Sequence, residues 1–189
     1  MATKRTIDSR QAARLLQPGP VALVTSLFRA QHNVMTAAWL MPLGTDPMLI
    51  GVAIRPDRLT HEFISRSEVF ALNIPTIELL NQVHRCGIES GRDRDKFLSA
   101  RLTPSDAVKL EVPLVEECVA HIECGVVQRL SMTDHDLFVA QVLAVSAFDD
   151  LFTDRWQMQA DSGLLHHIAG NEYAALGRTY RARLDEDEE

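Results

Sequence analysis

Hydrophobic runs of strand length recur along the chain and are separated by short polar or turn-forming segments. The apolar and β-branched stretches at 21–28, 47–54 and 68–75 are typical of buried strands. Two longer candidates, 118–130 and 135–148, are joined by a Ser-Met-Thr-Asp turn, which predicts a hairpin. About six strands joined mostly by short turns favour an antiparallel sheet or barrel, because a doubly wound fold needs regular alternation of strand and helix.

Short helices are expected between these strands. A first helix, capped by Asp8 or Ser9, ends at a Gln-Pro-Gly-Pro turn. A second begins near Thr60, and a third spans 76–87, where it ends at a glycine. The helices are too few and too short to cover both faces of a large sheet, so the fold is predicted to be mainly β.

The segment 31–39, Gln-His-Asn-Val-Met-Thr-Ala-Ala-Trp, does not have the composition of an ordinary strand. It follows the strand at 21–28 and is predicted to return beside it as the second arm of a hairpin. Asn33 and Thr36 are polar, two alanines follow them, and Trp39 ends the segment. Small residues beside a large ring leave room for a flat ligand, which makes this strand a candidate wall of a binding site.

Composition limits the classes of function. A chain of 189 residues with 46% hydrophobic residues suits one domain, expected over 1–184, followed by an acidic tail at 185–189 that we expect to be disordered. The formal net charge of −7 argues against nucleic-acid or anionic-membrane binding, both of which need a basic face. No apolar run is long enough to span a bilayer, and the three cysteines lack disulfide or zinc spacing, so we expect a cytoplasmic protein.

The sequence lacks the common catalytic and nucleotide-binding motifs. It has no Rossmann glycine fingerprint, no P-loop and no Gly-x-Ser-x-Gly elbow. The histidines show no metal spacing: His166 and His167 are adjacent and would face opposite sides of a strand. His121, Glu123 and Gly125 share one strand face, the usual pattern of a solvated face.

Two polar segments can bind an anion instead. Arg58 and Thr60 lie beside a predicted helix start, where unpaired N–H groups favour negative charge. The charged loop that follows the third helix supplies donors from Ser90 and Lys96 around a flexible Gly91. Combined with the segment 31–39, they suggest a site for a phosphate attached to a flat, partly apolar group.

Several segments, in their order along the chain, resemble the flavin reductase-like, FMN-binding split-barrel family, including its flavoredoxin-like members. The resemblance extends from Pro18 to Gly177. The segments that carry it are PGPVALVTS, HNVMTAAW, DPMLIGVAI, RLTHEFISRSEVFALNIP, SGRDRDKF, DHDLFVAQV and a closing HHIAGNEYAALG. It implies a six-stranded antiparallel Greek-key split β-barrel with short peripheral helices, assembled as a homodimer with FMN near the subunit interface.

The same resemblance implies which residues contact the flavin. Residues 166–168 would approach the flavin ring. The segment 31–39 would contribute Asn33, Met35, Thr36 and Trp39. The loop after the strand at 47–54 would contribute Arg58, Leu59 and Thr60 near the phosphate and ribityl chain. The charged loop after the third helix would contribute Ser90, Gly91 and Lys96. The chain departs from the family pattern at Ala140, where glycine is common, and at Gln31-His32, where a small turn is often found.

Three functions remain open at the level of sequence. The first is an NAD(P)H-dependent flavin reductase-like oxidoreductase, in which the cofactor performs the redox chemistry and the protein positions the nicotinamide, so no catalytic triad is needed. The second is an electron carrier of the flavoredoxin kind that receives electrons from a partner protein. The third is a non-catalytic barrel that has lost flavin. The choice between NADH and NADPH is also open, because no ribose-reading residue can be placed without a nucleotide fold.

Overall fold

A computed structural model describes residues 4–157, 163–177, 179 and 180 of the chain. The predicted acidic tail at 185–189 lies outside the described residues. Within the described ranges, no helix is long and apolar enough to cross a membrane. The helices are η1 Ser9–Gln11, α1 Ala12–Leu15, α2 Leu59–Ser67, η2 Ile77–Leu79, α3 Leu80–Ile88 and α4 Lys96–Ala100. The strands are β1 Gly19–Pro20, β2 Ala22–Phe28, β3 Gln31–Ala37, β4 Leu40–Thr45, β5 Met48–Ile54, β6 Val69–Ile74, β7 Pro104–Asp106, β8 Pro113–Val115, β9 Ala120–Ser131, β10 Asp136–Ala147, β11 Leu165–Ala169 and β12 Glu172–Ala175.

The main sheet is antiparallel and has seven strands in the order β3-β2-β6-β9-β10-β5-β4. The prediction of a mainly β, antiparallel split barrel is confirmed, with one strand more than the six expected. The additional strand is β4, whose Pro42 and Gly44 interrupt the apolar pattern of a strand. Proline is tolerated there because β4 is an edge strand, where one side of the backbone needs no ladder partner.

The connection between β3 and β4 shows that this sheet is strongly curled. The two strands are opposite edges of the sheet, yet only Ala38 and Trp39 separate them in sequence. In a flat sheet of seven strands, the two edge strands would lie about 29 Å apart. The chain from the end of β3 to the start of β4 spans three Cα–Cα steps, which reach about 11 Å. The edges must therefore come together, and β3 does contact β5 across the opening.

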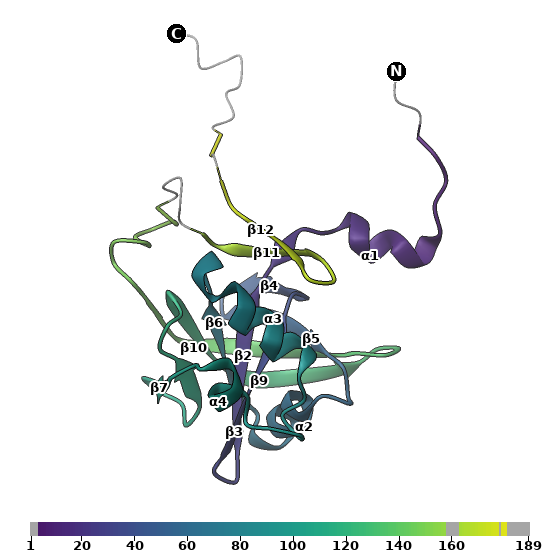
Figure 1. Ribbon diagram of the computed structural model, residues 1–189. Coiled ribbons are helices and arrows are strands. Elements are labelled where there is room, and N and C mark those ends of the chain that lie inside the picture. Colours follow the sequence, from purple (N-terminus) through teal and green to yellow (C-terminus); the bar gives the residue numbers. More distant parts are fainter. Residues whose placement is uncertain (1–3, 158–162, 178, 181–189) are drawn as a thin grey trace.

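Alternation along β2 separates two hydrophobic cores. Ala22 and Val24 pack inside the barrel with residues of β3, β5, α2, β6, β9 and β10. Val21 and Leu23 point to the outer face, where they pack against α3, α4 and β11. Figure 1 shows α3 and α4 lying against the outer side of β2 and β3. The helices therefore cover the side of the barrel that also carries the segment 31–39.

The two departures from the family pattern lie at different places in the barrel. Ala140 is fully buried in the barrel interior. Gln31 and His32 are already part of β3, because the turn before them consists of Arg29 and Ala30 alone, with Phe28 paired to Gln31.

Glu123 is buried, so the predicted solvated face on β9 is wrong at this position. Its side chain is 2% exposed, and its carboxylate accepts hydrogen bonds from the backbone N–H groups of Val108, Lys109 and Leu110 at 2.7–2.9 Å. The pattern could not show this, because the three donors come from a loop that only the folded chain brings over the strand. Glu123 thus ties this loop to the barrel.

Candidate functional site

A small polar cavity of about 40 Å³ lies between β3, the start of α2 and the end of α3. It brings together eight of the ten predicted cofactor-binding residues from three separate segments. The lining residues are Asn33, Met35, Asp57, Arg58, Leu59, Thr60, Cys86, Glu89, Ser90, Gly91 and Lys96. The structure therefore assembles one site from the three segments singled out in the sequence.

The first turn of α2 lines this cavity. Arg58 is the N-cap residue and has an extended backbone, but its side chain makes no capping hydrogen bond. The first N–H groups of a helix have no intrahelical partner, and the helix dipole gives this end a partial positive charge. Leu59 and Thr60 begin the helix and line the cavity, so this end of α2 suits an anionic group.

Asn33 and Thr60 form a buried polar pair that links β3 to α2. The Asn33 side chain is 3% exposed and donates from Nδ2 to Thr60 Oγ1 at 2.6 Å. Because the Thr60 oxygen accepts this bond, its hydroxyl hydrogen remains available to an acceptor in the cavity. The pair thus holds one donor in a fixed place.

Gly91 allows the loop after α3 to approach this pair closely. A Cβ atom at this position would lie 2.1 Å from Asn33 Oδ1 and 2.9 Å from Leu59 Cδ2. Both distances are far below van der Waals contact, so any larger residue would displace the loop or the polar pair. The glycine is required here by close packing.

Lys96 brings a buried positive charge to the same cavity. Its side chain is 5% exposed, and Nζ donates to the backbone carbonyls of Cys86 at 2.9 Å and Glu89 at 3.3 Å. Burial lowers the pKa of Lys96 to about 8. Among the described residues, no carboxylate forms a salt bridge with it, and the nearby Glu89 carboxylate offsets only part of the effect of burial on its pKa. An anion in the cavity would therefore be its first salt-bridge partner.

Cys86, Glu89 and Asp57 line the cavity without having been predicted from the sequence. Cys86 has no sequence signal as a site residue, since its position depends on how α3 packs. Burial raises the pKa of its thiol to about 11, so it is a neutral wall at physiological pH rather than a nucleophile. Asp57 directly precedes Arg58, which was predicted to contact the cofactor. Asp57 therefore lines the cavity because its neighbour does.

Thr36 and Trp39 do not line this cavity. The Thr36 hydroxyl donates to the carbonyl of Val83, which fastens β3 to α3. Trp39 is 48% exposed, and its ring centroid lies 4.7 Å from that of His135. A contact of either residue with the flavin stays a prediction.

The predicted ring-proximal segment 166–168 lies in β11, which pairs with β1 and β12. It does not line the cavity, and its approach to a flavin ring also stays a prediction. Nowhere in the described ranges are three or more His, Cys, Asp or Glu side chains grouped so that they could hold a metal ion.

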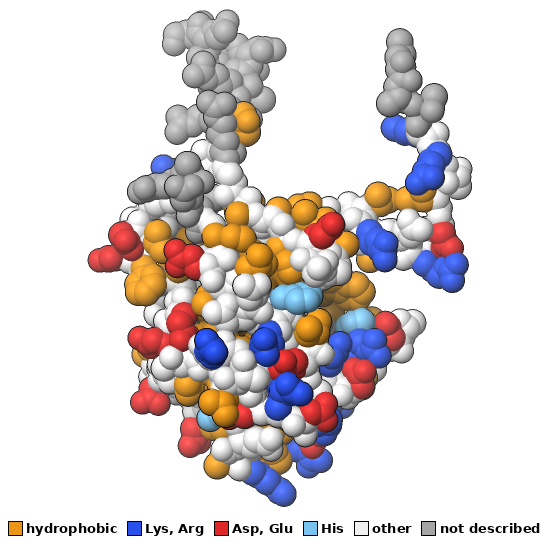
Figure 2. Space-filling view, viewed as in Figure 1, with side chains coloured by type: hydrophobic (Ala, Val, Ile, Leu, Met, Phe, Trp, Pro, Cys, Tyr) orange, Lys and Arg blue, Asp and Glu red, His pale blue; other side chains and the backbone are white. Residues whose placement is uncertain are grey.

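Charge is unevenly distributed around the cavity. Figure 2 shows Lys and Arg side chains on the lower part of the visible face, over α2, α4 and the tip of the β2–β3 hairpin, interspersed with acidic ones. This local gathering of basic groups contrasts with the net charge of −7 for the whole chain.

Comparison with known proteins places the chain among flavin-binding barrels. Residues 14–169 match the family model described as flavin reductase like domain. An uncharacterised protein of Pyrococcus abyssi is 35% identical over 170 residues, which are 89% of this chain and 97% of that protein. The NADH-dependent flavin reductase StyB of Pseudomonas fluorescens is 29% identical over 146 residues, covering 73% of this chain and 78% of the relative.

A solved structure shows the same fold. The crystal structure of an FMN-binding protein from Thermus thermophilus with bound cyclohexenone superposes with a TM-score of 0.84 at 26% identity. The match covers 97% of this chain and all of the other. The architecture is therefore shared along almost the whole length.

Proposed function

Because the chain belongs to the flavin reductase-like domain family, we propose that it is an FMN-binding oxidoreductase that transfers a hydride from NADH or NADPH to flavin. The observation that carries this proposal is the buried ammonium of Lys96 in one cavity with the uncapped start of α2. Among the described residues, no carboxylate forms a salt bridge with Lys96, although Asp57 and Glu89 also line the cavity. A terminal phosphate is a ligand that satisfies both the ammonium and the helix start.

The residues present fit such a phosphate. Lys96 would supply a charge-assisted hydrogen bond, Thr60 a hydroxyl donor, and the first turn of α2 its backbone N–H groups. Gly91 keeps the loop close enough to enclose the group, and the Ser90 hydroxyl lies at the same rim. Arg58 is partly exposed and also lines the cavity, and its guanidinium lies 3.8 Å from the Asp57 carboxylate.

The remaining predicted contacts would orient the rest of the cofactor. Asn33 and Met35 line the cavity from β3, so they are assigned to the ribityl chain and the near side of the ring. When bound, FMN supplies the ability to accept a hydride and release electrons. The protein's contribution is to bind, to orient and to exclude water, which agrees with the lack of a catalytic triad in the sequence.

The assay measures flavin binding and turnover separately. Purified protein is titrated with FMN by calorimetry, and NADH or NADPH oxidation is followed at fixed FMN. Thr60→Val removes the hydroxyl at nearly constant shape and is expected to weaken FMN binding about tenfold. Thr133→Val, at the exposed β9–β10 turn, is the matched control. Absence of FMN binding would refute the proposal, and tight binding without NAD(P)H oxidation would favour an electron carrier.

We also propose a homodimer, as the family resemblance implies. The edge strand β4 and its neighbourhood expose large apolar side chains that a partner copy would cover: Trp39 48%, Met41 51%, Leu43 41% and Met48 39%. Light scattering of the purified chain tests this, and a monomer at micromolar concentration would contradict it. The three cysteines, Cys86, Cys118 and Cys124, are buried free thiols, which suits the cytoplasmic location we propose.

A further inference from the structure

The first turn of α2 is held from two sides by neighbouring residues. Thr60 accepts a hydrogen bond from Asn33 of β3 at 2.6 Å, and His61 Nε2 lies 2.8 Å from the Asp136 carboxylate of β10. β3 is one edge of the main sheet, whereas β10 lies near the other edge, with only β5 and β4 beyond it. The start of α2 therefore bridges two distant parts of the curled sheet.

The His61–Asp136 pair is buried, and packing fixes its geometry. Both side chains are 11% exposed. The His61 ring meets the buried ring of Phe138 edge to face, with the two centroids 5.1 Å apart. Two apolar side chains of similar volume would often stabilise a protein as well as a buried charged pair does, but they would not fix a direction. The polar pair is therefore suited to orienting α2, in addition to any stability it adds.

Arg129 of β9 extends this contact to the next turn of the helix. Its Nε lies 3.7 Å from Asp136 Oδ2, and its Nη1 donates to the Ser65 hydroxyl at 3.0 Å. Ser65 follows His61 by four residues, so the two side chains lie on one face of the helix. The β9–β10 hairpin thus holds two successive turns of α2. Two such points fix the direction of a helix axis, which a single contact does not.

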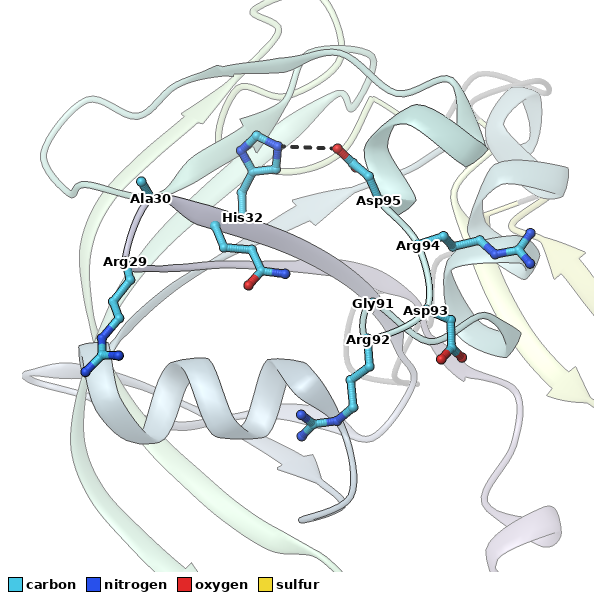
Figure 3. A pocket seen from close by; sticks show the side chains of 9 residues that line it. Arg29, Ala30, His32, Gly91, Arg92, Asp93, Arg94 and Asp95 are labelled. Atoms are coloured by element: carbon cyan, nitrogen blue, oxygen red, sulfur yellow. Dashed lines mark ion pairs between the residues drawn. The ribbon is translucent and has the colours of Figure 1, made fainter.

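On the β3 side, the second contact to α2 is weaker. Arg92 Nη2 lies 2.9 Å from the Glu62 carboxylate, and Figure 3 shows the Arg92 side chain extending toward α2 from the loop before α4. These two side chains are 48% and 37% exposed, and Glu62 also lies 3.8 Å from Arg66. Exposed ion pairs contribute little, about 0–1 kcal/mol. The buried contacts of Thr60 and His61 are therefore the ones that set the position of the helix start.

This position matters because the two residues before His61 line the proposed phosphate cavity. The Glu62 N–H donates to the Arg58 carbonyl at 3.3 Å, the first hydrogen bond of the helix. Between these residues, the N–H groups of Leu59, Thr60 and His61 have no intrahelical acceptor. Leu59 and Thr60 line the cavity. A small rotation of α2 would therefore move every donor that its first turn offers to a phosphate.

We propose that the His61–Asp136 pair positions the phosphate-binding end of α2; the inference rests on the proposed function. Asn33 fixes the start of the helix against β3, and Asp136 fixes it against β10. Neither His61 nor Asp136 lines the cavity, yet the affinity for the phosphate of FMN depends on the bond between them. The affinity for the ring and the ribityl chain does not.

The test compares FMN with riboflavin, which has the same ring and ribityl chain but no phosphate. The full-length protein is titrated with each ligand by calorimetry. His61→Leu removes the hydrogen bond at similar side-chain volume and should weaken FMN binding about tenfold, while riboflavin binding changes by less than about twofold. His61→Gln keeps an N–H donor directed to Asp136 and should bind FMN within about threefold of the wild type.

A double-mutant cycle assigns the effect to the pair. Asp136→Ala alone should weaken FMN binding about tenfold, and combining it with His61→Leu should add little, because both changes remove the same bond. His121→Leu is the matched control. His121 is also partly buried and lies 2.9 Å from a side-chain oxygen, that of Asn73, but this contact joins β9 to β6 and does not involve α2. It should change neither affinity, and thermal unfolding verifies that each variant is folded.

The outcomes are distinguishable. Unchanged FMN affinity in His61→Leu, equal losses for FMN and riboflavin, or additive losses in the double variant overturn the inference and leave the proposed function intact. A wild-type protein that binds no FMN overturns both. If His61→Leu does not fold, His61→Asn takes its place, because its side chain is polar but too short to reach Asp136.

Discussion

The affinity for FMN should depend on pH through Lys96. The ammonium group is buried among backbone carbonyls, and burial lowers its pKa to about 8. A phosphate is already doubly charged above about pH 7, since its second pKa is about 6. Raising the pH therefore leaves the ligand unchanged and removes the proton from Lys96. Only the protonated lysine gives the charge-assisted bond, so affinity falls as pH rises.

The magnitude follows from the pKa of about 8. The free protein is about 90% protonated at Lys96 near pH 7 and about 10% near pH 9. A bound dianion raises the pKa of the lysine, so binding takes up a proton in this interval. The dissociation constant for FMN should rise about tenfold from pH 7 to pH 9, a change of about 1.4 kcal/mol in binding free energy.

Calorimetry in buffers of different ionisation enthalpy measures both the affinity and the proton uptake. Lys96→Met should bind FMN more weakly by about tenfold or more near pH 7, and its affinity should no longer vary with pH. Lys109→Met replaces an exposed lysine that does not line the cavity, so the affinity of this variant for FMN should depend on pH as in the wild type. A dissociation constant for FMN that is constant over this pH interval in the wild type would refute the assignment of Lys96 to the phosphate.

Three further predictions concern packing and buried polar groups. Gly91→Ala places a Cβ atom against Asn33 Oδ1 and should weaken FMN binding more than about tenfold by titration, whereas Gly177→Ala, with no neighbour within 4 Å, should leave it unchanged. Glu123→Ala leaves three backbone N–H groups without an acceptor and should lower the free energy of unfolding by about 3 kcal/mol in urea denaturation. A loss below about 1 kcal/mol would show that water replaces the carboxylate. The hydrogen bond from His61 lowers the pKa of Asp136, so its stabilising effect is present above the unfolded-state pKa and is lost as the pH falls through the lower, folded-state pKa. Asp136→Asn should therefore flatten the acid side of the stability profile below about pH 4, and an unchanged profile would contradict it.

The local pattern of apolar and polar residues was sufficient to predict most strands of the main sheet and to locate the segments that form the candidate site. Runs of apolar and β-branched residues predicted β2, β5, β6 and the β9–β10 hairpin, because a buried strand needs such residues on its faces. Strand β4 was not predicted, since Pro42 and Gly44 break the pattern and only the free edge of the sheet makes them acceptable. Glu123 was assigned to a solvated face for a related reason: its partners lie in a loop that no periodicity describes.

The sequence by itself determined that the chain forms an antiparallel β structure and that three short segments together carry groups suited to a phosphate attached to a flat, partly apolar group. These properties depend on neighbouring residues and on side-chain chemistry, both of which can be read locally. Only the tertiary structure decided that the three segments meet, because curling of the sheet brings β3 beside α2 and the end of α3. It also decided that Lys96 is buried and that Thr36 faces α3, since burial and facing depend on contacts between residues far apart in sequence.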